Sequence, residues 1–271
     1  MRVLVTGWRG YVGRAVEAEA VGAGIEVVRF AGDVRDEAAV RAGVRGVDGV
    51  VHLGGLARVR ESVERAREYF DVNVGGTLNL LRHGVERFVF ASTGSVYGGG
   101  GVLDEDSPVR PANPYAASKL AAEEAVRWVG HGVVLRLFNV AGGGDRDDTR
   151  VITRACGVAA GRLPGMDVYG DGTAVRDFVH VRDVARAFVH VLATGDGVYN
   201  VGATSASVAD VLASVARVSG REVPATRKPA NPGEIPELRA DTSRLRATGW
   251  RPRDSALDDV VRDQWLTEPG A

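Results

Sequence analysis

The chain has 271 residues, of which 34 are Lys or Arg and 35 are Asp or Glu, so its formal net charge is −1. This balance argues against a nucleic-acid or membrane-surface partner, and no apolar run reaches the roughly 18 residues that span a bilayer. The single cysteine, Cys156, excludes an internal disulfide framework. We expect no signal peptide at this N-terminus and a reducing, cytoplasmic location.

Short segments rich in β-branched residues alternate with helical patterns along the first half of the chain. They predict strands at Arg2–Thr6, Glu26–Arg29, Gly49–His52, Arg87–Ser92 and Val133–Leu137. The segments between them predict helices at Tyr11–Gly22, Glu37–Gly43, Glu68–Arg82 and Tyr115–Val129. Wholly apolar strands in this alternation predict an α/β fold with a Rossmann-type, doubly wound parallel sheet. Ligands of such a sheet bind beyond the carboxyl ends of its strands.

A glycine-rich turn joins the first predicted strand to the first helix. Its sequence is Thr6-Gly7-Trp8-Arg9-Gly10-Tyr11-Val12-Gly13. Glycines permit a tight turn and let a pyrophosphate approach the backbone, and the helix N-terminus offers N–H groups and positive charge to it. The alternative is a glycine turn without a ligand. We assign to an NAD(P) site Gly7, Arg9, Gly10, Tyr11, Val12 and Gly13.

The end of the second predicted strand indicates which dinucleotide to expect. An acidic residue there usually holds the adenosine ribose hydroxyls, but this chain has Arg29-Phe30-Ala31. Arg9 and Arg29 suit a 2′-phosphate, so we predict a preference for NADP(H) over NAD(H). The alternative is that both arginines are surface charges.

Two further segments complete the predicted cofactor site. In Gly32-Asp33-Val34-Arg35-Asp36, Asp33 can accept a hydrogen bond from the adenine amino group or, as we expect of Asp36, cap the following helix. His52-Leu53-Gly54-Gly55 ends the third strand, and we expect His52 to be a packed structural residue. The histidines show no metal-ligand spacing, so we predict no metal site. We assign to the cofactor Asp33, Val34, Leu53, Gly54 and Gly55.

Tyr115 and Lys119 stand four residues apart in a predicted helix and therefore share one face. An ammonium near a phenol lowers its pKa and makes it a usable acid or base near neutral pH. This spacing alone is common on solvated helix faces. Thr93, in the cluster Ser92-Thr93-Gly94-Ser95, adds a hydroxyl at the end of the fourth strand. Together with the glycine turn, these residues predict hydride-transfer chemistry with Thr93, Tyr115 and Lys119 as catalytic residues.

The last part of the chain has a different pattern. Val208–Ser219 predicts a helix, and prolines then interrupt the sequence at Pro224, Pro229, Pro232, Pro236 and Pro252. We expect a dinucleotide-binding part made of residues 1–139 and about 166–203. A smaller substrate-binding lobe is expected from residues about 140–165 and 204–271.

The chain resembles the extended short-chain dehydrogenase/reductase superfamily, in its NAD-dependent epimerase/dehydratase branch of nucleotide-sugar enzymes. The matching segments are TGWRGYVG, GDVRD, HLGG, NVGGTLNLL, ASTGSVYG, NPYAASK, RLFNVAGG, GDGTAVRDFVHVRDVARA and PGEIPELRADTSRLRATGW. The resemblance implies that Tyr115 transfers the hydroxyl proton and that Thr93 holds the reacting oxygen. It also implies that Lys119 binds the nicotinamide ribose, so Tyr115 and Lys119 contact the cofactor too.

The resemblance also implies a substrate site and a partner. Asn139 and Arg176 take positions that contact the substrate diphosphate, with the alternative that Arg176 pairs with Asp177 or Asp183. The predicted substrate residues are Asn73, Thr93, Ser95, Asn139, Arg176 and Asn231. Helices equivalent to Glu68–Arg82 and Tyr115–Val129 pack between subunits in relatives, so we expect a homodimer.

Departures from the family pattern narrow the expected reaction. The 4,6-dehydratases carry an Asp-Glu pair where Gly94 and Ser95 stand, and the sugar-acid decarboxylases need a Glu at Ser95. The 3,5-epimerases of the fucose-synthase type have Cys and His in place of Ser95 and Gly144. Hydride transfer with one Tyr acid/base remains, which means 4-epimerisation, ketone reduction or alcohol oxidation.

One departure concerns the substrate. The epimerases carry an Arg before P-G-D in the C-terminal lobe, where this chain has Ala230-Asn231-Pro232-Gly233-Glu234. Asn231 cannot supply a bidentate charge, and Arg227 or Lys228 stands nearby as a replacement. We expect a nucleotide-linked sugar, with an unphosphorylated hydroxy or keto compound as the alternative substrate. A non-catalytic dinucleotide sensor is the remote alternative.

Overall fold

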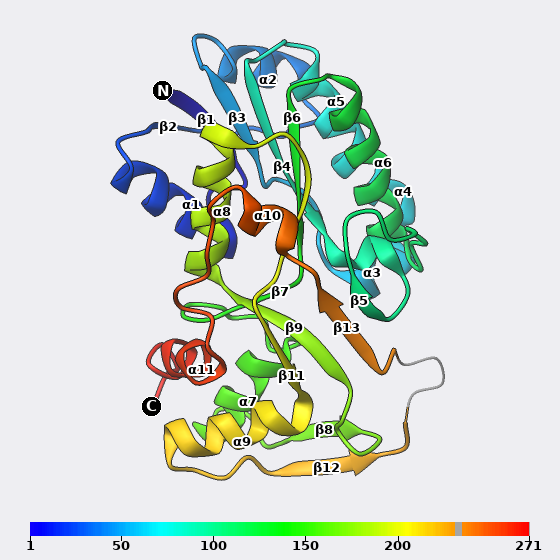
Figure 1. The fold of residues 1–271 in the computed structure, drawn as a ribbon, viewed down its shortest axis with the longest axis vertical. Helices are drawn as coiled ribbons and strands as arrows, with labels where there is room; N and C mark the ends of the chain where they lie inside the picture. Colours follow the sequence, from blue (N-terminus) through cyan, green and yellow to red (C-terminus); the bar gives the residue numbers. More distant parts are fainter. Residues whose placement is uncertain (231–234, 271) are drawn as a thin grey trace.

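A six-stranded parallel sheet forms the centre of the upper part of the molecule (Figure 1). The computed structural model describes residues 1–230 and 235–270. The strand order is β10-β6-β4-β3-β1-β2. The bounds are β1 (Arg2–Thr6), β2 (Glu26–Arg29), β3 (Gly49–His52), β4 (Arg87–Thr93), β6 (Gly132–Leu137) and β10 (Gly197–Val201). All neighbouring strands run parallel, so their carboxyl ends lie at one edge.

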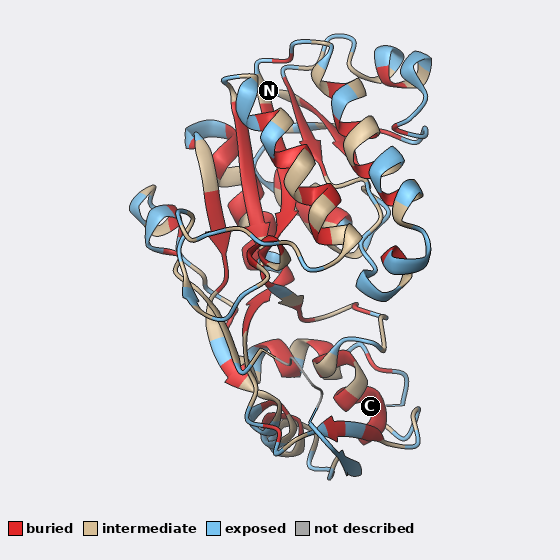
Figure 2. Cartoon of the chain, turned by 90° about the vertical axis from the view of Figure 1, so that its right-hand side faces the viewer, coloured by how far each residue is buried: buried red, intermediate tan, exposed pale blue. Residues whose placement is uncertain are grey.

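Helices cover both faces of this sheet, as the doubly wound fold requires. On one face α1 (Tyr11–Gly22) and α8 (Val181–Thr194) share a core with β1, β4 and β6. On the other face lie α2 (Glu37–Gly43), α5 (Gly76–Leu81) and α6 (Pro114–Trp128). Figure 2 shows the strands buried between helices whose outer surfaces are exposed. The predicted α/β class is therefore confirmed.

The predicted helix at Glu68–Arg82 is divided in the structure. It consists of α4 (Ala66–Phe70), a π-helical turn (Asp71–Gly75) and α5. The prediction of one regular helix was wrong, because apolar periodicity cannot reveal an inserted residue. The extra residue of a π turn changes the direction of the side chains it carries. Here Asn73 is buried within this turn.

The carboxyl ends of the central strands face a second layer, in the lower part of Figure 1. A mixed sheet contains β11 (Thr204–Ser207), β9 (Val175–His180), β13 (Glu237–Ala240) and β5 (Gly101–Leu103), and β7 (Asn139–Ala141) pairs with β9. Below it lie α7 (Val151–Ala159), α9 (Val208–Ser219), α11 (Leu257–Trp265), and the pair β8 (Met166–Tyr169) and β12 (Ala225–Lys228). Short helices at other places are α3 (Val59–Glu64), the 3-10 turn Gly94–Tyr97 and α10 (Ser243–Ala247).

This lower layer has a core of its own, which places it as a separate packing unit. Buried residues of α7, α9 and α11 pack together with Met166 and Phe178. The predicted division into two parts stays a prediction. It placed Met166 and Phe178 in the dinucleotide-binding part, whereas in the structure both pack in the core of the lower layer. Within the described residues, no helix has both the length and the apolar character needed to cross a membrane.

Candidate active site

A cavity of about 630 Å³ lies between the carboxyl ends of the central strands and the lower layer. This volume is within the range of about 300–1,000 Å³ that is usual for small-molecule sites. Many of the residues predicted from the sequence line it: Gly7, Gly10, Tyr11, Val12, Gly13, Leu53, Gly55, Thr93, Tyr115, Lys119, Asn139 and Arg176. The fold therefore brings segments from most of the chain to one cavity.

The glycine turn has the geometry that a pyrophosphate needs. Gly7 has a φ of +68°, which a residue with a side chain rarely adopts. A Cβ atom at Gly13 would stand 2.2 Å from the Gly7 carbonyl oxygen, so only glycine lets α1 begin so close to β1. Gly10 precedes α1 and contributes no side-chain cap, so the N–H groups of the first turn are available to an anion. These residues fit a dinucleotide.

A second cavity of about 370 Å³ adjoins the first, and Gly7 and Gly55 line both. Its wall holds the other predicted cofactor residues Arg9, Asp33, Val34 and Gly54, together with Trp8 and Phe30. Asp33 accepts hydrogen bonds from the backbone N–H of Arg35 at 2.9 Å and from its Nη2 atom at 2.6 Å. These bonds lower the pKa of Asp33. Asp36 caps α2 through Ala38 and Ala39, as expected.

The structure gives Arg29 a different position from the one predicted. Among the described residues, Arg29 is outside the lining of both cavities. Its Nε atom donates to Glu17 Oε1 at 2.6 Å, and its guanidinium lies 5.2 Å from the Trp8 ring. Arg9 lies over the same ring at 4.8 Å and does line the second cavity. A carboxylate on α1 therefore neutralises one of the two cations on which the NADP(H) preference was predicted.

His52 is a structural residue whose imidazole joins Thr6 of β1 to Thr77 of α5 by hydrogen bonds. Thr77 donates its hydroxyl proton to the Asn73 carbonyl, so it accepts from His52 Nε2 at 3.1 Å. Thr6 accepts from Gly54 N and donates to His52 Nδ1 at 2.7 Å. Burial, and then the charge of Lys119, lower the pKa of His52 to about 3. The imidazole is therefore neutral at physiological pH and acts as a fixed hydrogen-bonding bridge.

Asn73 is also placed away from the cavity lining, in contrast to its predicted contact with substrate. Its Oδ1 atom accepts from Leu56 N at 2.8 Å, and its Nδ2 atom donates to Leu56 O and to Ser118 Oγ at 2.9 Å. The π turn directs Asn73 into this position. Asn73 therefore joins the loop after β3 to α6, the helix that carries Tyr115 and Lys119.

Thr93 and Tyr115 meet at the cavity because of two local features. Thr93 is the last residue of β4, and Tyr115 is the second residue of α6, whose start is fixed by the Asn113 cap and by Pro114. Both side chains line the same cavity, and the Thr93 hydroxyl is near enough to the Tyr115 phenol to lower its pKa. The hydroxyl cluster and the Tyr/Lys helix therefore form one group, although about twenty residues separate them in the sequence.

The pKa of Tyr115 differs from the expectation: it is raised, although a nearby Lys119 was expected to lower it. Burial raises the pKa of Tyr115, while the Thr93 hydroxyl and the charge of Arg150 oppose that rise. Lys119 instead donates from Nζ to the Ala91 carbonyl at 2.9 Å and lies over the Phe90 ring. Burial lowers the pKa of Lys119 to about 8, against the opposing charge of Glu123. The phenol is thus protonated in this state, the form that donates a proton to a ketone oxygen.

Arg150 is a cavity residue that the sequence did not reveal. It stands at the start of α7, lines the main cavity, and lies 5.6 Å from the ring of Tyr11. Its Nη1 atom is 3.2 Å from the Asp145 carboxylate. Tyr11 is itself fixed by a hydrogen bond from its hydroxyl to Gly142 O at 2.8 Å. No motif marks Arg150, because its place beside Tyr11 depends on how the lower layer packs.

The remaining predicted substrate residues have different environments. Asn139 Nδ2 donates to Asp177 O at 2.9 Å, and Arg176 Nη1 donates to Val175 O and to Ile235 O at 2.9 Å. Ser95 follows Thr93 in the 3-10 turn and donates its backbone N–H to Thr93 Oγ1, outside the cavity lining. Asn231 lies outside the described residues. The suggested replacements, Arg227 and Lys228, are exposed on β12 away from the cavity lining.

Comparisons with known proteins agree with this geometry. The model of the NAD dependent epimerase/dehydratase family matches residues 3–202. The UDP-glucose 4-epimerase of Azospirillum brasilense is 36% identical over 313 residues, covering 96% of this chain and 90% of that protein. A Bifidobacterium longum UDP-glucose 4-epimerase, solved with NAD+ and UDP, matches with a TM-score of 0.89 and 31% identity over 98% of both chains. RMD from Pseudomonas aeruginosa, solved with NADPH, matches with a TM-score of 0.89, 28% identity and the same coverage.

Proposed function

Because this chain belongs to the NAD dependent epimerase/dehydratase family, we propose that it is a nucleotide-sugar 4-epimerase using Thr93, Tyr115 and Lys119. It is an NAD(P)-dependent enzyme of the extended short-chain dehydrogenase/reductase type. The observation that carries the proposal is the main cavity, where these three side chains and the glycine turn lie together. Relatives that are UDP-glucose 4-epimerases support the choice of reaction.

The chain's own residues perform the proton transfer of this reaction. A bound nicotinamide would accept a hydride from the sugar carbon and return it. Tyr115 must first lose its own proton; as the phenolate it takes the proton of the sugar hydroxyl while the ketone forms, and it gives that proton back as the ketone is reduced. Thr93 lines the same cavity and presents a hydroxyl beside Tyr115. Lys119 contributes a positive charge at the base of the cavity, which favours negative charge on the phenol and the sugar oxygen.

The cavity is suited to an anionic substrate. Its lining contains the cations Arg150, Arg176 and Lys119, and no carboxylate lines it within residues 1–230 and 235–270. A guanidinium binds a diphosphate with charge-assisted, bidentate hydrogen bonds. We assign Arg176, Asn139 and Arg150 to the diphosphate end of the substrate. Arg150 is added to the set predicted from the sequence because it faces the same cavity as Tyr115.

The proposed cofactor is NAD(H), a change from the preference for NADP(H) that the sequence predicted. Glu17 pairs with Arg29, so this guanidinium is already neutralised and lies outside both cavities, which removes one of the two cations expected to bind a 2′-phosphate. Relatives contain NAD in epimerase structures and NADPH in RMD. Arg9 keeps the earlier prediction testable, because it lines the second cavity. An epimerase also returns the hydride to the same substrate and therefore consumes no cofactor.

The proposed function is tested with protein as it is purified. We expect it to interconvert UDP-glucose and UDP-galactose without added cofactor, and mass spectrometry of the denatured protein to detect NAD. Turnover that requires a continuous supply of NADPH would contradict the proposal and favour a ketoreductase. Turnover of only unphosphorylated hydroxy or keto compounds would favour the alternative substrate class. An Arg9→Ala variant with an unchanged ratio of NAD(H) to NADP(H) affinity would show that Arg9 is a surface charge.

We also propose a homodimer, formed through the helices predicted to pack between subunits. α4, α5 and α6 lie side by side on one face of the molecule (Figure 1). They expose Phe70, Leu78 and Trp128, and Trp128 is 86% exposed. A cytoplasmic location remains part of the proposal, on the basis of the single, buried Cys156.

The dimer interface is tested by charge substitution. Leu78→Glu/Trp128→Glu is expected to convert a dimer to a monomer in analytical ultracentrifugation, because carboxylates in an apolar interface are costly to desolvate. Val21→Glu is the matched control, since Val21 is an exposed apolar residue of α1 on the other face of the sheet. A wild-type protein that sediments as a monomer at micromolar concentration would contradict the proposal.

A further inference from the structure

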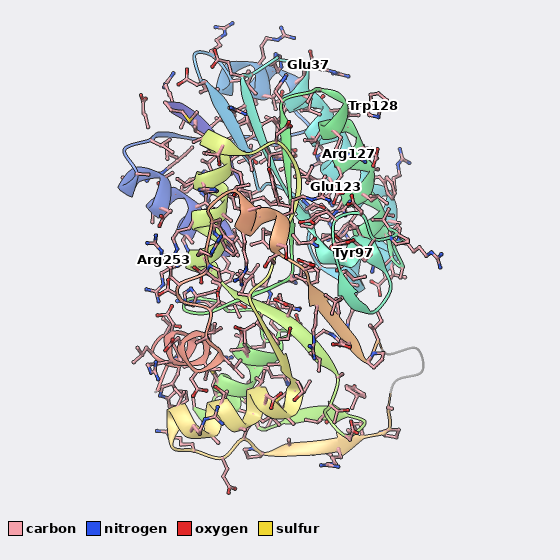
Figure 3. All side chains as sticks on the ribbon, viewed as in Figure 1. Glu37, Tyr97, Glu123, Arg127, Trp128 and Arg253 are labelled. Carbon is pink, nitrogen blue, oxygen red and sulfur yellow. The ribbon has the colours of Figure 1, made fainter. Side chains whose placement is uncertain are left out.

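A buried ion pair lies directly behind the catalytic group. Glu123 is on α6, one helical turn after Lys119, and Arg136 is on β6. Glu123 is 0% exposed and Arg136 is 4% exposed. Arg136 Nη2 is 2.8 Å from Glu123 Oε2, and its Nε atom contacts both carboxylate oxygens. Figure 3 labels Glu123, with Arg127 and Trp128 further along the same helix.

The pair is connected to both sides of the segment that carries Thr93. On one side, Ser92 donates its hydroxyl to the Glu123 carboxylate. On the other side, Arg136 Nη1 donates to the Tyr97 hydroxyl at 3.1 Å. Ser92 and Tyr97 flank the residues Thr93–Val96, so one ion pair holds the strand end and the 3-10 turn that follows it.

The connection extends to the lower layer. Tyr97 donates to Asn200 Oδ1 at 2.7 Å, and Asn200 Nδ2 donates to Leu103 O and Asp241 O. Arg136 Nη1 also donates to Glu105 O. The side chains of this network are therefore hydrogen-bonded throughout, as a buried polar group requires.

Stability alone does not account for such a pair. Removing two charges from water is costly, and apolar residues of similar volume often give equal or greater stability. The elements that the pair joins are α6, β4 and the turn Gly94–Tyr97, which together carry Lys119, Tyr115 and Thr93.

We propose that Glu123 and Arg136 are positioning residues for hydride transfer: they align Thr93 with the Tyr115 face of α6, and Glu123 supplies the negative charge that accompanies Lys119. The charged and titratable groups around Lys119 support this role. Tyr115 and Glu123 lie on its own helix, neutral His52 on β3 and Arg136 on β6, and Tyr69 of α4 contacts Tyr115 edge to face. Glu123 is the group that opposes the effect of burial on the Lys119 pKa.

The test follows Lys119 directly, because Lys119 and Lys228 are the only lysines in the sequence. Protein labelled with ¹³C and ¹⁵N at the lysine side chain gives two signals in an NMR titration, and Lys228→Arg assigns them. Wild-type Lys119 is expected to titrate near pH 8. In Glu123→Gln the Arg136 charge is no longer balanced, so the pKa of Lys119 is expected to fall by about one unit.

Activity supplies the second measurement. Misalignment of Thr93 and Tyr115 is expected to lower kcat of Glu123→Gln by about tenfold to a hundredfold. The high-pH limit of its activity is expected to move to lower pH, since Lys119 loses its charge earlier. This kcat measurement rests on the proposed function, whereas the titration of Lys119 needs no substrate. A failure of the proposed function and a failure of the positioning role of Glu123 can therefore be told apart.

The matched control is Glu124→Gln, which removes a carboxylate from the next position of α6. Glu124 pairs with Arg127 at 2.8 Å, and both side chains are about half exposed. Neither the Lys119 titration nor kcat is expected to change in it. If Glu123→Gln does not fold, Glu123→Leu/Arg136→Met removes both buried charges and serves in its place. A folded variant of either kind with wild-type kcat and wild-type Lys119 titration would overturn the proposal.

Discussion

Tyr115→Phe is expected to lower kcat by about two to three orders of magnitude, the contribution of one well-placed acid or base. The substitution removes only the phenolic oxygen of a residue that lines the main cavity together with Thr93. Cofactor affinity is expected to change little, because the glycine turn and the adjoining cavity are untouched. Steady-state kinetics and a titration with NAD(H) measure the two effects separately.

Tyr169→Phe is the control for this prediction. Tyr169 is an exposed tyrosine of β8 and is outside the lining of the main cavity. Its substitution by Phe removes the same phenolic oxygen. Its kcat is expected to equal that of the wild type. Near-normal turnover by Tyr115→Phe across the whole pH range would exclude Tyr115 as the acid/base and with it the proposed mechanism.

Arg176→Ala is expected to raise the Kd for UDP by about one to two orders of magnitude, as the loss of a charge-assisted contact of about 1.5–3 kcal/mol implies. Arg176 lines the same cavity as Tyr115, at the side formed by β9. The Michaelis constant for the nucleotide sugar is expected to rise by the same factor, with a smaller effect on kcat. Isothermal titration calorimetry with UDP measures the binding without any turnover.

Arg176 also has hydrogen bonds to the carbonyls of Val175 and Ile235, so its contribution to stability is measured in parallel. Arg227→Ala is the matched control, because Arg227 is an exposed arginine of the same layer and outside the cavity lining. A lower Tm with an unchanged Kd for UDP would assign Arg176 a purely structural role. An unphosphorylated substrate would then become the better interpretation.

The sequence alone determined the central architecture, because local patterns encode local structure. Apolar segments predicted five strands of the central sheet with almost the same bounds as in the structure, whereas β10 (Gly197–Val201) was not predicted. Gly7, Gly10 and Gly13 identified the pyrophosphate turn, since only glycine permits its backbone and its close packing. The four-residue spacing of Tyr115 and Lys119 placed both on one helix face, and the motif order identified the family.

Only the tertiary structure decided which charged groups meet. The pairing of Arg29 with Glu17 and the contact of Arg150 with Tyr11 join different elements of the chain. The Glu123–Arg136 pair likewise depends on α6 covering β6. Residue periodicity specifies which face of an element is apolar, but it contains no information on which element packs against that face. The cofactor preference inferred from Arg9 and Arg29 is not supported by the pairing of Arg29 with Glu17, which the sequence could not reveal. Arg150 could be found only once the lower layer was in place.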